Sequence, residues 1–382
     1  MVKKYLDFKF SEFTTNKNFN FSRKKILKVL PEKHLLDAHK VISKWKGYKK
    51  TPLINLRILS KKLHTNNIFY KDESKRFGLK SFKALGGAYA VEKIVKNKKK
   101  VTVSTATAGN HGKSVSWGAK KIGARCKIFI SENVSNTRAI EMEKLGADVI
   151  RVKGNYEKSL KVCKEISKKK GWKIIQDVAW RNYEYVPKLT MAGYSVMIKE
   201  ISNQTKHYIT HVFLQAGVGG MAAAVAAYTK RRYGDERPVI VLADPDQSAC
   251  WLESIRLGTP SPVHGDLNTL MAGLACGEVS VIAWDILRQT ADAVMSVMDD
   301  DAVAMMRVLA NPTANDQAIV AGESAVAGLA ALMAAADDAQ ARSALGLDAH
   351  SQILIFGTES DTDPDLYVNL IGRSADEVRR AS

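Results

Sequence analysis

The chain has 382 residues, of which 46% are hydrophobic and 25% charged, and its formal net charge is +19. A chain of this length can bury a large core and is expected to form two domains. No apolar run approaches the length of a membrane span and the N-terminus lacks a signal-peptide core, so we expect a cytoplasmic protein with no membrane partner.

Short apolar strands and helices are expected to alternate along most of the chain. The expected strands cover residues 67–72, 101–104, 125–130, 148–152, 173–176, 211–215, 239–243, 293–297 and 352–356. The expected helices begin near residue 82 and then cover residues 110–122, 136–145, 156–169, 183–202, 220–233, 300–310 and 322–335. This alternation predicts an α/β fold with mostly parallel sheets that helices cover on both faces. Residues 1–50 and 250–292 give no clear pattern.

Lys83 is the first candidate for chemistry. It follows the strand at 67–72 and a polar loop broken by Gly78, and it lies in the first turn of the helix that begins near Phe82. Exposed N–H groups and the helix dipole disfavour an ammonium there. We therefore expect the pKa of Lys83 to fall, which favours its free amine as a nucleophile toward a carbonyl. A solvated lysine is the alternative, because lysine is abundant in this chain.

Other polar or small residues follow the expected strands at their carboxyl ends, where ligands bind in parallel sheets. These are Thr107–Gly112 after the second strand, Asp177 after the fifth, Gln215–Met221 after the sixth and Gly357–Asp363 after the last. We expect these loops and Lys83 to form one site.

Gly217, Gly219 and Gly220 separate an apolar strand from a helix, so backbone N–H groups can approach an anion at the helix N-terminus. Tight packing of the helix against the strand also explains such a loop. A dinucleotide-binding fold would need a longer glycine pattern, although Asp235 and Asp244 lie near the spacing of its acidic residue.

A reactive lysine together with a phosphate-sized loop suggests pyridoxal phosphate, whose aldehyde bonds to a lysine amine. Asn110 can donate a hydrogen bond to the ring hydroxyl oxygen, and Thr358 can meet the pyridine nitrogen. A hydroxyl at that nitrogen leaves it largely unprotonated, which favours elimination over transamination. A helix cap at Asn110 and an ordinary turn residue at Thr358 are the alternatives.

The charge is divided unevenly along the chain. Residues 1–206 carry 40 Lys and 7 Arg against 16 acidic residues, a net charge of +31, whereas residues 207–382 have a net charge of −12. The lysine runs lack interleaved aromatic residues, so solvated helix faces explain them better than a nucleic-acid partner. The abrupt change suggests a chain joined from two sources near residue 206, with natural charge asymmetry as the alternative. The four cysteines show no C-x-x-C spacing, so neither a metal site nor a disulfide framework is indicated.

The chain resembles the fold-type II pyridoxal-phosphate enzymes, the group that contains threonine dehydratase and the tryptophan synthase β chain, and within them the diaminopropionate ammonia-lyases. The matching segments keep the family order on both sides of residue 206. They are residues 71–90, 109–112, 176–180, 214–221, 271–278, 311–312 with 315–316, 322–324 and 358–363.

The resemblance implies a domain organisation and an assembly. A large cofactor-binding domain would comprise residues 1–85 and 207–382, and a small domain residues 86–206, each with a mostly parallel sheet flanked by helices. The family is generally dimeric, so a homodimer is expected. The partner would be a small amino-acid substrate.

The resemblance also implies roles for the candidate residues. Lys83 would bond to the cofactor aldehyde, Asn110 would bind its ring oxygen and Thr358 its ring nitrogen. Asp177 would take the α-proton of L-2,3-diaminopropionate, after which the β-amino group leaves as ammonia, protonated by Lys83, and the product hydrolyses to pyruvate and a second ammonia. The backbone of a five-residue loop would bind the cofactor phosphate: Gly217, Val218, Gly219, Gly220 and Met221.

The chain departs from the family pattern at a few positions. Ala108 replaces an aspartate that the resemblance assigns to proton removal from the D-isomer, so we expect weak or absent activity on that isomer. Ala108 also makes the loop similar to that of hydroxy-amino-acid dehydratases, so L-serine or L-threonine is an alternative substrate. Gly357 stands where a hydroxyl residue is expected, and Ser360 and Ala314 stand where glycine is expected and can strain their loops.

Two further readings stay open. The chain can be a cofactor-binding protein without turnover if its loops are misplaced. Cys250 and Cys276 match cysteines of the resemblance, and they can form a bridge, although a cytoplasmic setting favours free thiols.

Overall fold

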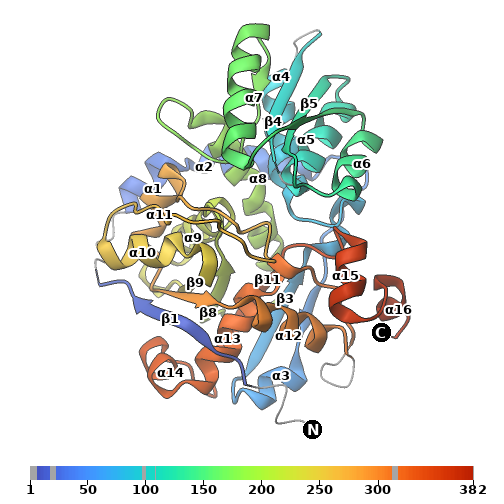
Figure 1. Cartoon of the computed structure of the whole chain (residues 1–382). Helices are drawn as coiled ribbons and strands as arrows, with labels where there is room; N and C mark the ends of the chain where they lie inside the picture. The colour runs from blue at the N-terminus through green and yellow to red at the C-terminus, as the bar shows by residue number, and fades with distance from the viewer. Residues whose placement is uncertain (1–6, 18–22, 97–99, 108, 312–316, 382) are drawn as a thin grey trace.

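The computed structural model describes residues 7–17, 23–96, 100–107, 109–311 and 317–381. This part of the chain forms two sheets, with the smaller one at the top of Figure 1 and the larger one below it. The strand order of the larger sheet is β1 (Phe10–Thr15), β10 (Ala293–Val297), β9 (Val239–Pro245), β8 (His211–Gln215), β11 (Gln352–Gly357), β3 (Asn67–Asp72) and β2 (Leu53–Asn55). The order of the smaller sheet is β6 (Ala147–Val152), β5 (Arg125–Ser131), β4 (Thr102–Ala106) and β7 (Lys173–Ile174).

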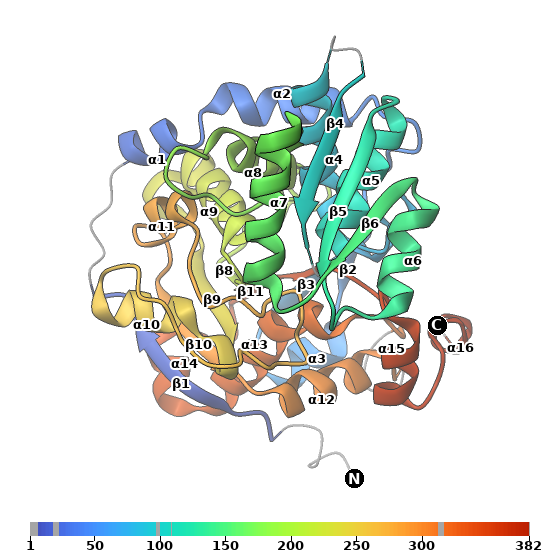
Figure 2. The ribbon, with the colours of Figure 1, turned by 45° about the horizontal axis from the view of Figure 1, so that its top comes forward.

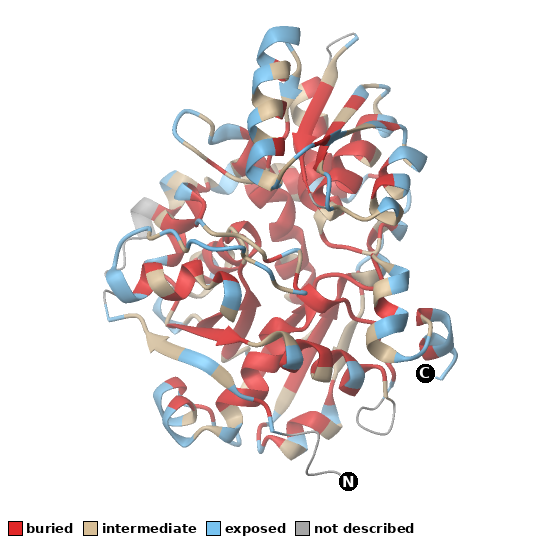
Figure 3. Ribbon diagram, viewed as in Figure 1, coloured by how far each residue is buried: buried red, intermediate tan, exposed pale blue. Residues whose placement is uncertain are grey.

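Parallel pairing dominates both sheets, as the alternating pattern predicts. The five inner strands of the larger sheet run parallel to one another, and only the edge strands β1 and β2 pair antiparallel. All three ladders of the smaller sheet are parallel. β8 and β10 are buried along their whole length, because helices cover such strands on both faces. Figure 3 shows buried strands at the centre of each half and exposed residues on the outer helices.

Sixteen helices are present among the described residues. They are α1 (Arg23–Val29), α2 (Glu32–Ile42), α3 (Arg57–Lys62), α4 (Lys83–Val95), α5 (Asn110–Lys121), α6 (Asn136–Lys144), α7 (Tyr156–Lys170), α8 (Tyr185–Ile201), α9 (Gly220–Tyr233), α10 (Cys250–Leu257), α11 (Val281–Leu287), α12 (Asp299–Leu309), α13 (Ala327–Asp337), α14 (Ala339–Leu345), α15 (Pro364–Ile371) and α16 (Ala375–Arg380). In Figure 2, α7 lies in front of the smaller sheet, while α4 and α5 pack together behind it. None of these helices combines the length and the apolar character that a membrane crossing requires.

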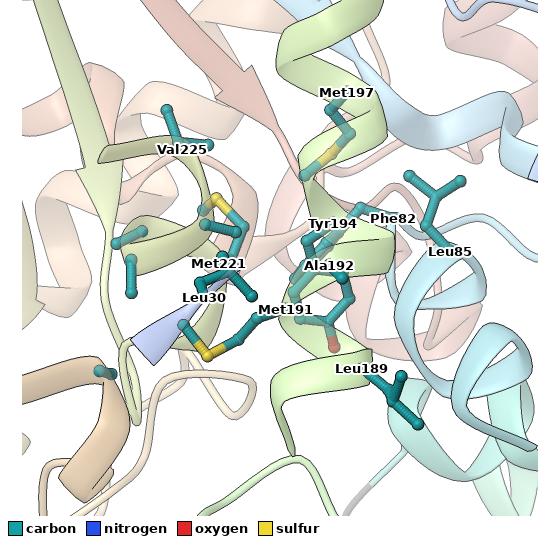
Figure 4. Close-up of a cluster of buried hydrophobic side chains, with 14 of the residues drawn as sticks. Leu30, Phe82, Leu85, Leu189, Met191, Ala192, Tyr194, Met197, Met221 and Val225 are labelled. Carbon is teal, nitrogen blue, oxygen red and sulfur yellow. The ribbon is translucent and has the colours of Figure 1, made fainter. Parts of the chain in front are cut away.

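Helix α8 joins the two halves of the molecule. It packs against α2, α4 and α9, and its residues are buried along nearly its whole length. Figure 4 shows Met191 of α8 beside Met221 of α9, with Leu85 of α4 on the other side of α8. These side chains belong to one cluster of buried residues that extends through both halves, so the halves share one continuous core. Each large apolar side chain buried in this core contributes about 1.5–3 kcal/mol to stability.

A buried cluster of four charged side chains ties β3 and the turn after it to the C-terminal end of α8. The Lys71 ammonium lies 2.7 Å from the Glu200 carboxylate, and the Arg76 guanidinium lies 2.8 Å from both Glu73 and Glu200. All four side chains are at most 1% exposed. The cluster fixes the segment that leads toward Lys83.

The sequence patterns misplace or miss some elements. α13 begins at Ala327, later than expected, because a 3₁₀ turn at Glu323–Ala325 precedes it. Strands β1 and β2 and helices α10 and α11 lie in regions where we found no clear pattern or expected no element. The domain boundaries at residues 85 and 206 and the suggested join near residue 206 stay predictions.

Candidate active site

A cavity of about 310 Å³ lies at the carboxyl ends of strands from both sheets. All the residues to which we assigned catalytic or cofactor-binding roles line it. They are Lys83, Asn110, Asp177, Gly217, Val218, Gly219, Gly220, Met221 and Thr358. The fold therefore brings these residues together, whereas the individual roles stay predictions.

Lys83 and Asp177 form an ion pair inside the cavity. Lys83 is the first residue of α4, as expected, and its Nζ lies 2.7 Å from Asp177 Oδ2. Asp177 lies three residues after β7, which is shorter than the expected strand. The two side chains are 21% and 12% exposed, so both are largely sheltered from water yet open to a ligand.

The expected fall in the pKa of Lys83 is wrong for this arrangement. Burial does lower the pKa of Lys83, but the Asp177 carboxylate outweighs it and raises that pKa above its ordinary value. Burial raises the pKa of Asp177, while the charge of the Lys83 ammonium and its hydrogen bond outweigh it and hold that pKa below the ordinary range. In this ion pair Lys83 is therefore an ammonium, and Asp177 is a carboxylate.

His111 lies beside the carboxylate side of this pair. Its Nε2 donates to the carbonyl of Ile175 at 2.8 Å, and its Nδ1 lies 3.6 Å from Asp177 Oδ2. Burial lowers the pKa of His111, which favours the neutral ring. Since Nε2 carries the hydrogen, Nδ1 is an acceptor with no hydrogen-bond partner among the described residues.

The glycine loop after β8 forms a cradle that fits a phosphate. Gly219 has a φ of +91°, and a Cβ added there would lie 2.2 Å from the ring of Trp251. The indole nitrogen of Trp251 donates to the carbonyl of Gly217 at 2.8 Å, which fixes the loop. The first N–H groups of α9 have no acceptor within the helix, so this end of the helix suits an anion. The loop and Lys83 together therefore fit pyridoxal phosphate.

Thr358 lines the cavity from the end of β11 and Asn110 from the start of α5. Thr358 follows β11, and its hydroxyl oxygen lies 2.9 Å from the side-chain nitrogen of Gln215. Asn110 is the first residue of α5, whose N-cap is Gly109, so Asn110 does not cap the helix. Its side-chain nitrogen donates to the carboxylate of Glu359.

Two buried carboxylates and an arginine line the cavity without having been predicted individually. Arg138 lies 3.2 Å from Glu323, and both Glu323 and Glu359 are 5% exposed. Burial and the neighbouring Glu359 raise the pKa of Glu323 to about 7. Glu323 and Glu359 lie in segments that carry the family resemblance, which is the signal that points to them. Arg138 lies outside those segments and no pattern indicates it.

The structure explains two of the departures from the family pattern. A Cβ at Gly357 would lie 2.1 Å from the ring of Tyr70, so Tyr70 fills the space that a side chain would need. Ser360 does not adopt a positive φ, so the strain expected there is wrong. Ala108 and Ala314 lie outside the described residues.

The cysteines have free thiols. The Cys250 thiol lies 4.0 Å from the carbonyl of Gly217, and Cys276 lines the cavity. Both therefore flank the glycine loop in reduced form. Within the described ranges, no cluster of three or more His, Cys, Asp or Glu side chains suits a metal ion.

Comparison with known proteins identifies relatives that match nearly the whole chain. The model of the family described as "Pyridoxal-phosphate dependent enzyme" matches residues 44–353. Diaminopropionate ammonia-lyase of Escherichia coli K12 is 34% identical over 384 residues, which cover 94% of this chain and 96% of that protein. The crystal structure of the holo form of that E. coli enzyme has a TM-score of 0.90 at 33% identity and covers 95% of this chain and 97% of its own. A biosynthetic L-threonine dehydratase of Haemophilus influenzae is 29% identical over 264 residues, 68% of this chain and 48% of that protein.

Proposed function

Because the chain belongs to the pyridoxal-phosphate-dependent enzyme family, we propose that it is an ammonia-lyase that converts L-2,3-diaminopropionate to pyruvate and ammonia. The observation that carries this proposal is the ion pair between Lys83 and Asp177 at 2.7 Å inside the cavity. It places a proton donor and a proton acceptor in contact, as an elimination requires. The homology to diaminopropionate ammonia-lyase over nearly the whole chain supports the substrate.

The chain would hold the cofactor with residues from four segments. Lys83 would bond to its aldehyde, the backbone of residues 217–221 would bind its phosphate, and Asn110 and Thr358 would bind its ring oxygen and ring nitrogen. When bound, pyridoxal phosphate supplies an electron sink for the negative charge that develops at the substrate α-carbon. For Asn110 this role requires its amide to serve the ring oxygen beside its contact with Glu359.

Asp177 and Lys83 would carry the proton transfers. Asp177 Oδ2 would accept the α-proton of the L-substrate, and its lowered pKa ensures that the carboxylate is ionised before the reaction. Once the substrate amine has displaced it from the cofactor aldehyde, Lys83 Nζ would give a proton to the departing β-nitrogen. The cavity walls shelter both groups from most of the solvent, which strengthens their electrostatic interactions.

L-serine and L-threonine are the second candidate substrates. Ala108 favours them, because it matches the loop of hydroxy-amino-acid dehydratases and removes the carboxylate assigned to the D-isomer of the diamine. The same substitution predicts that the D-isomer is turned over weakly or not at all.

Pyruvate release from purified, cofactor-loaded protein tests the proposal, with L-2,3-diaminopropionate, D-2,3-diaminopropionate and L-serine as separate substrates. We expect turnover of the L-diamine alone. A preference for serine would move the chain to the dehydratases, and equal turnover of both diamine isomers would contradict the role given to Ala108. Bound cofactor without turnover of any of the three would identify a binding protein.

A homodimer in the cytoplasm completes the proposal, and the family resemblance supports it. Light scattering of the purified protein during gel filtration measures the assembly directly. A mass near the 42.1 kDa of one chain would contradict the dimer.

A further inference from the structure

Gln215 connects three elements beside the cavity. It is the last residue of β8, is 3% exposed and lines the cavity. Its side-chain nitrogen lies 2.8 Å from the carbonyl oxygen of Phe356, 3.1 Å from that of Ala325 and 2.9 Å from the hydroxyl oxygen of Thr358.

These contacts fix the orientation of the Gln215 amide. The carbonyl oxygens of Phe356 and Ala325 can only accept hydrogen bonds, so the side-chain atom between them must be the NH₂ group. The hydroxyl oxygen of Thr358 faces the same NH₂ group, which shares its two hydrogens among the three oxygens and accepts none, so the hydroxyl does not donate to it. Because a threonine hydroxyl has a single hydrogen, that hydrogen is left to point elsewhere.

We propose that Gln215 is a positioning residue that directs the hydroxyl hydrogen of Thr358 to the ring nitrogen of the bound cofactor. Thr358 is 4% exposed and lines the cavity, so its hydroxyl hydrogen is directed into the cavity. The ring nitrogen then accepts a hydrogen bond and stays unprotonated. The inference rests on the proposed role of Thr358 and on the cofactor of the family, and it does not depend on the substrate.

The inference goes beyond a simple tie between strand ends. β8 and β11 are parallel neighbours in the larger sheet, and Gln215 also reaches the 3₁₀ turn before α13. If Gln215 served only as this tie, its loss would weaken the fold without changing the ring nitrogen. With the positioning role, its loss leaves the carbonyl oxygens of Phe356 and Ala325 without their donor. The Thr358 hydroxyl also loses the neighbour that faces its oxygen, so its hydrogen is no longer directed to the ring.

Nitrogen NMR of the holoenzyme distinguishes the two roles. The protein is loaded with pyridoxal phosphate carrying ¹⁵N in the ring, and the ring resonance is compared for the wild type, Gln215→Met, Thr358→Val and the double variant. Methionine keeps the length of glutamine without its donors. We expect a hydrogen-bonded, unprotonated nitrogen in the wild type, and a shift toward free pyridine in Gln215→Met that approaches the value in Thr358→Val.

The double variant and the cofactor affinity complete the test. The double variant should match Thr358→Val, because Gln215 acts through the threonine hydroxyl. The dissociation constant of the cofactor should rise about fivefold to tenfold in each single variant, as for the loss of one hydrogen bond, and no further in the double variant. Gln289→Leu is the matched control, since Gln289 is a buried glutamine outside the cavity, and it should leave the resonance unchanged.

Several outcomes would overturn the inference. They are a protonated ring nitrogen in the wild type, a wild-type resonance in Gln215→Met, and a Gln215 effect that persists in the Thr358→Val background. If Gln215→Met does not fold, Gln215→Leu takes its place in the comparison of resonances. A protonated ring nitrogen in the wild type would overturn the inference without any variant. The readout needs bound cofactor but no turnover, so a failure of the proposed lyase activity remains distinguishable from a failure here.

Discussion

Replacement of Glu200 by glutamine tests the buried charge cluster that anchors the segment before Lys83. The two carboxylate oxygens of Glu200 contact Lys71 at 2.7 Å and Arg76 at 2.8 and 2.9 Å, with every partner at most 1% exposed. In Glu200→Gln, two buried cations share the single remaining carboxylate of Glu73. Removal of one partner from a buried pair leaves an uncompensated charge, so we expect a loss of about 3–5 kcal/mol in the free energy of unfolding.

Urea unfolding followed by tryptophan fluorescence measures this loss. Glu184→Gln is the control, because Glu184 pairs with Lys188 at 2.7 Å but is 46% exposed, and loss of an exposed pair costs at most about 0.5 kcal/mol. Equal, small losses in the two variants would refute the reasoning that burial makes the Glu200 pairs indispensable.

The pH dependence of the same difference gives an independent check. Burial raises the pKa of Glu200, but Arg76 and Lys71 outweigh it and lower that pKa. A carboxylate with a lowered pKa stabilises the fold above its ordinary pKa and loses that contribution as the pH falls through the folded value. The stability difference between the wild type and Glu200→Gln should therefore shrink in acid.

Three further predictions concern the cavity. Asp177→Asn should lower the rate of pyruvate formation about 10²–10⁴-fold while the cofactor absorbance shows that binding is retained, and an unchanged rate would place the base elsewhere. Gly219→Ala should weaken cofactor binding at least about tenfold and cost about 1–3 kcal/mol in unfolding free energy, because of its positive φ and the contact of its Cβ with Trp251. Gly146→Ala, which has a similar φ of +88° but open space, should show the smaller cost of backbone strain alone. Glu323 has a pKa raised from 4.5 to about 7, so between these pH values the folded state keeps a proton that the unfolded state releases. The free energy of unfolding should therefore fall by about 3 kcal/mol as the pH rises from 4.5 to about 7. Glu323→Gln should remove this slope in unfolding measurements at pH 5 and pH 8.

The parallel core and the position of the cavity follow from local patterns in the sequence. β3, β8 and β10 occupy the expected residues because each is a short apolar run bounded by polar or glycine-rich turns. Since ligands gather at the carboxyl ends of such strands, the loops after β4, β8 and β11 could be assigned to one site before the structure was known. The family resemblance, confirmed by the comparisons, supplied the cofactor.

Features that depend on distant partners could not be read from the sequence. The prediction for Lys83 considered only its own helix, whereas Asp177 lies 94 residues away in the chain and reverses the sign of the pKa shift. Edge strand β1 has only partly buried or exposed residues, so it carries no continuous apolar run. Arg138 reaches the cavity only because α6 lies against the start of α15, where it also approaches Asp363 at 3.5 Å.

The central place of β11 in the larger sheet bears on how the protein is made. β11 lies between β8 and β3, and Gln352 pairs with Asn67, so the sheet joins residues from nearly opposite ends of the chain. While the ribosome is still adding residues before 352, β3 has only the three-residue strand β2 beside it, and the apolar edges of β3 and β8 are unpaired. Such non-local pairing makes folding slow and exposes edges that aggregate. The nascent chain therefore completes its core only after synthesis is nearly finished, and a chain truncated before residue 352 should be insoluble.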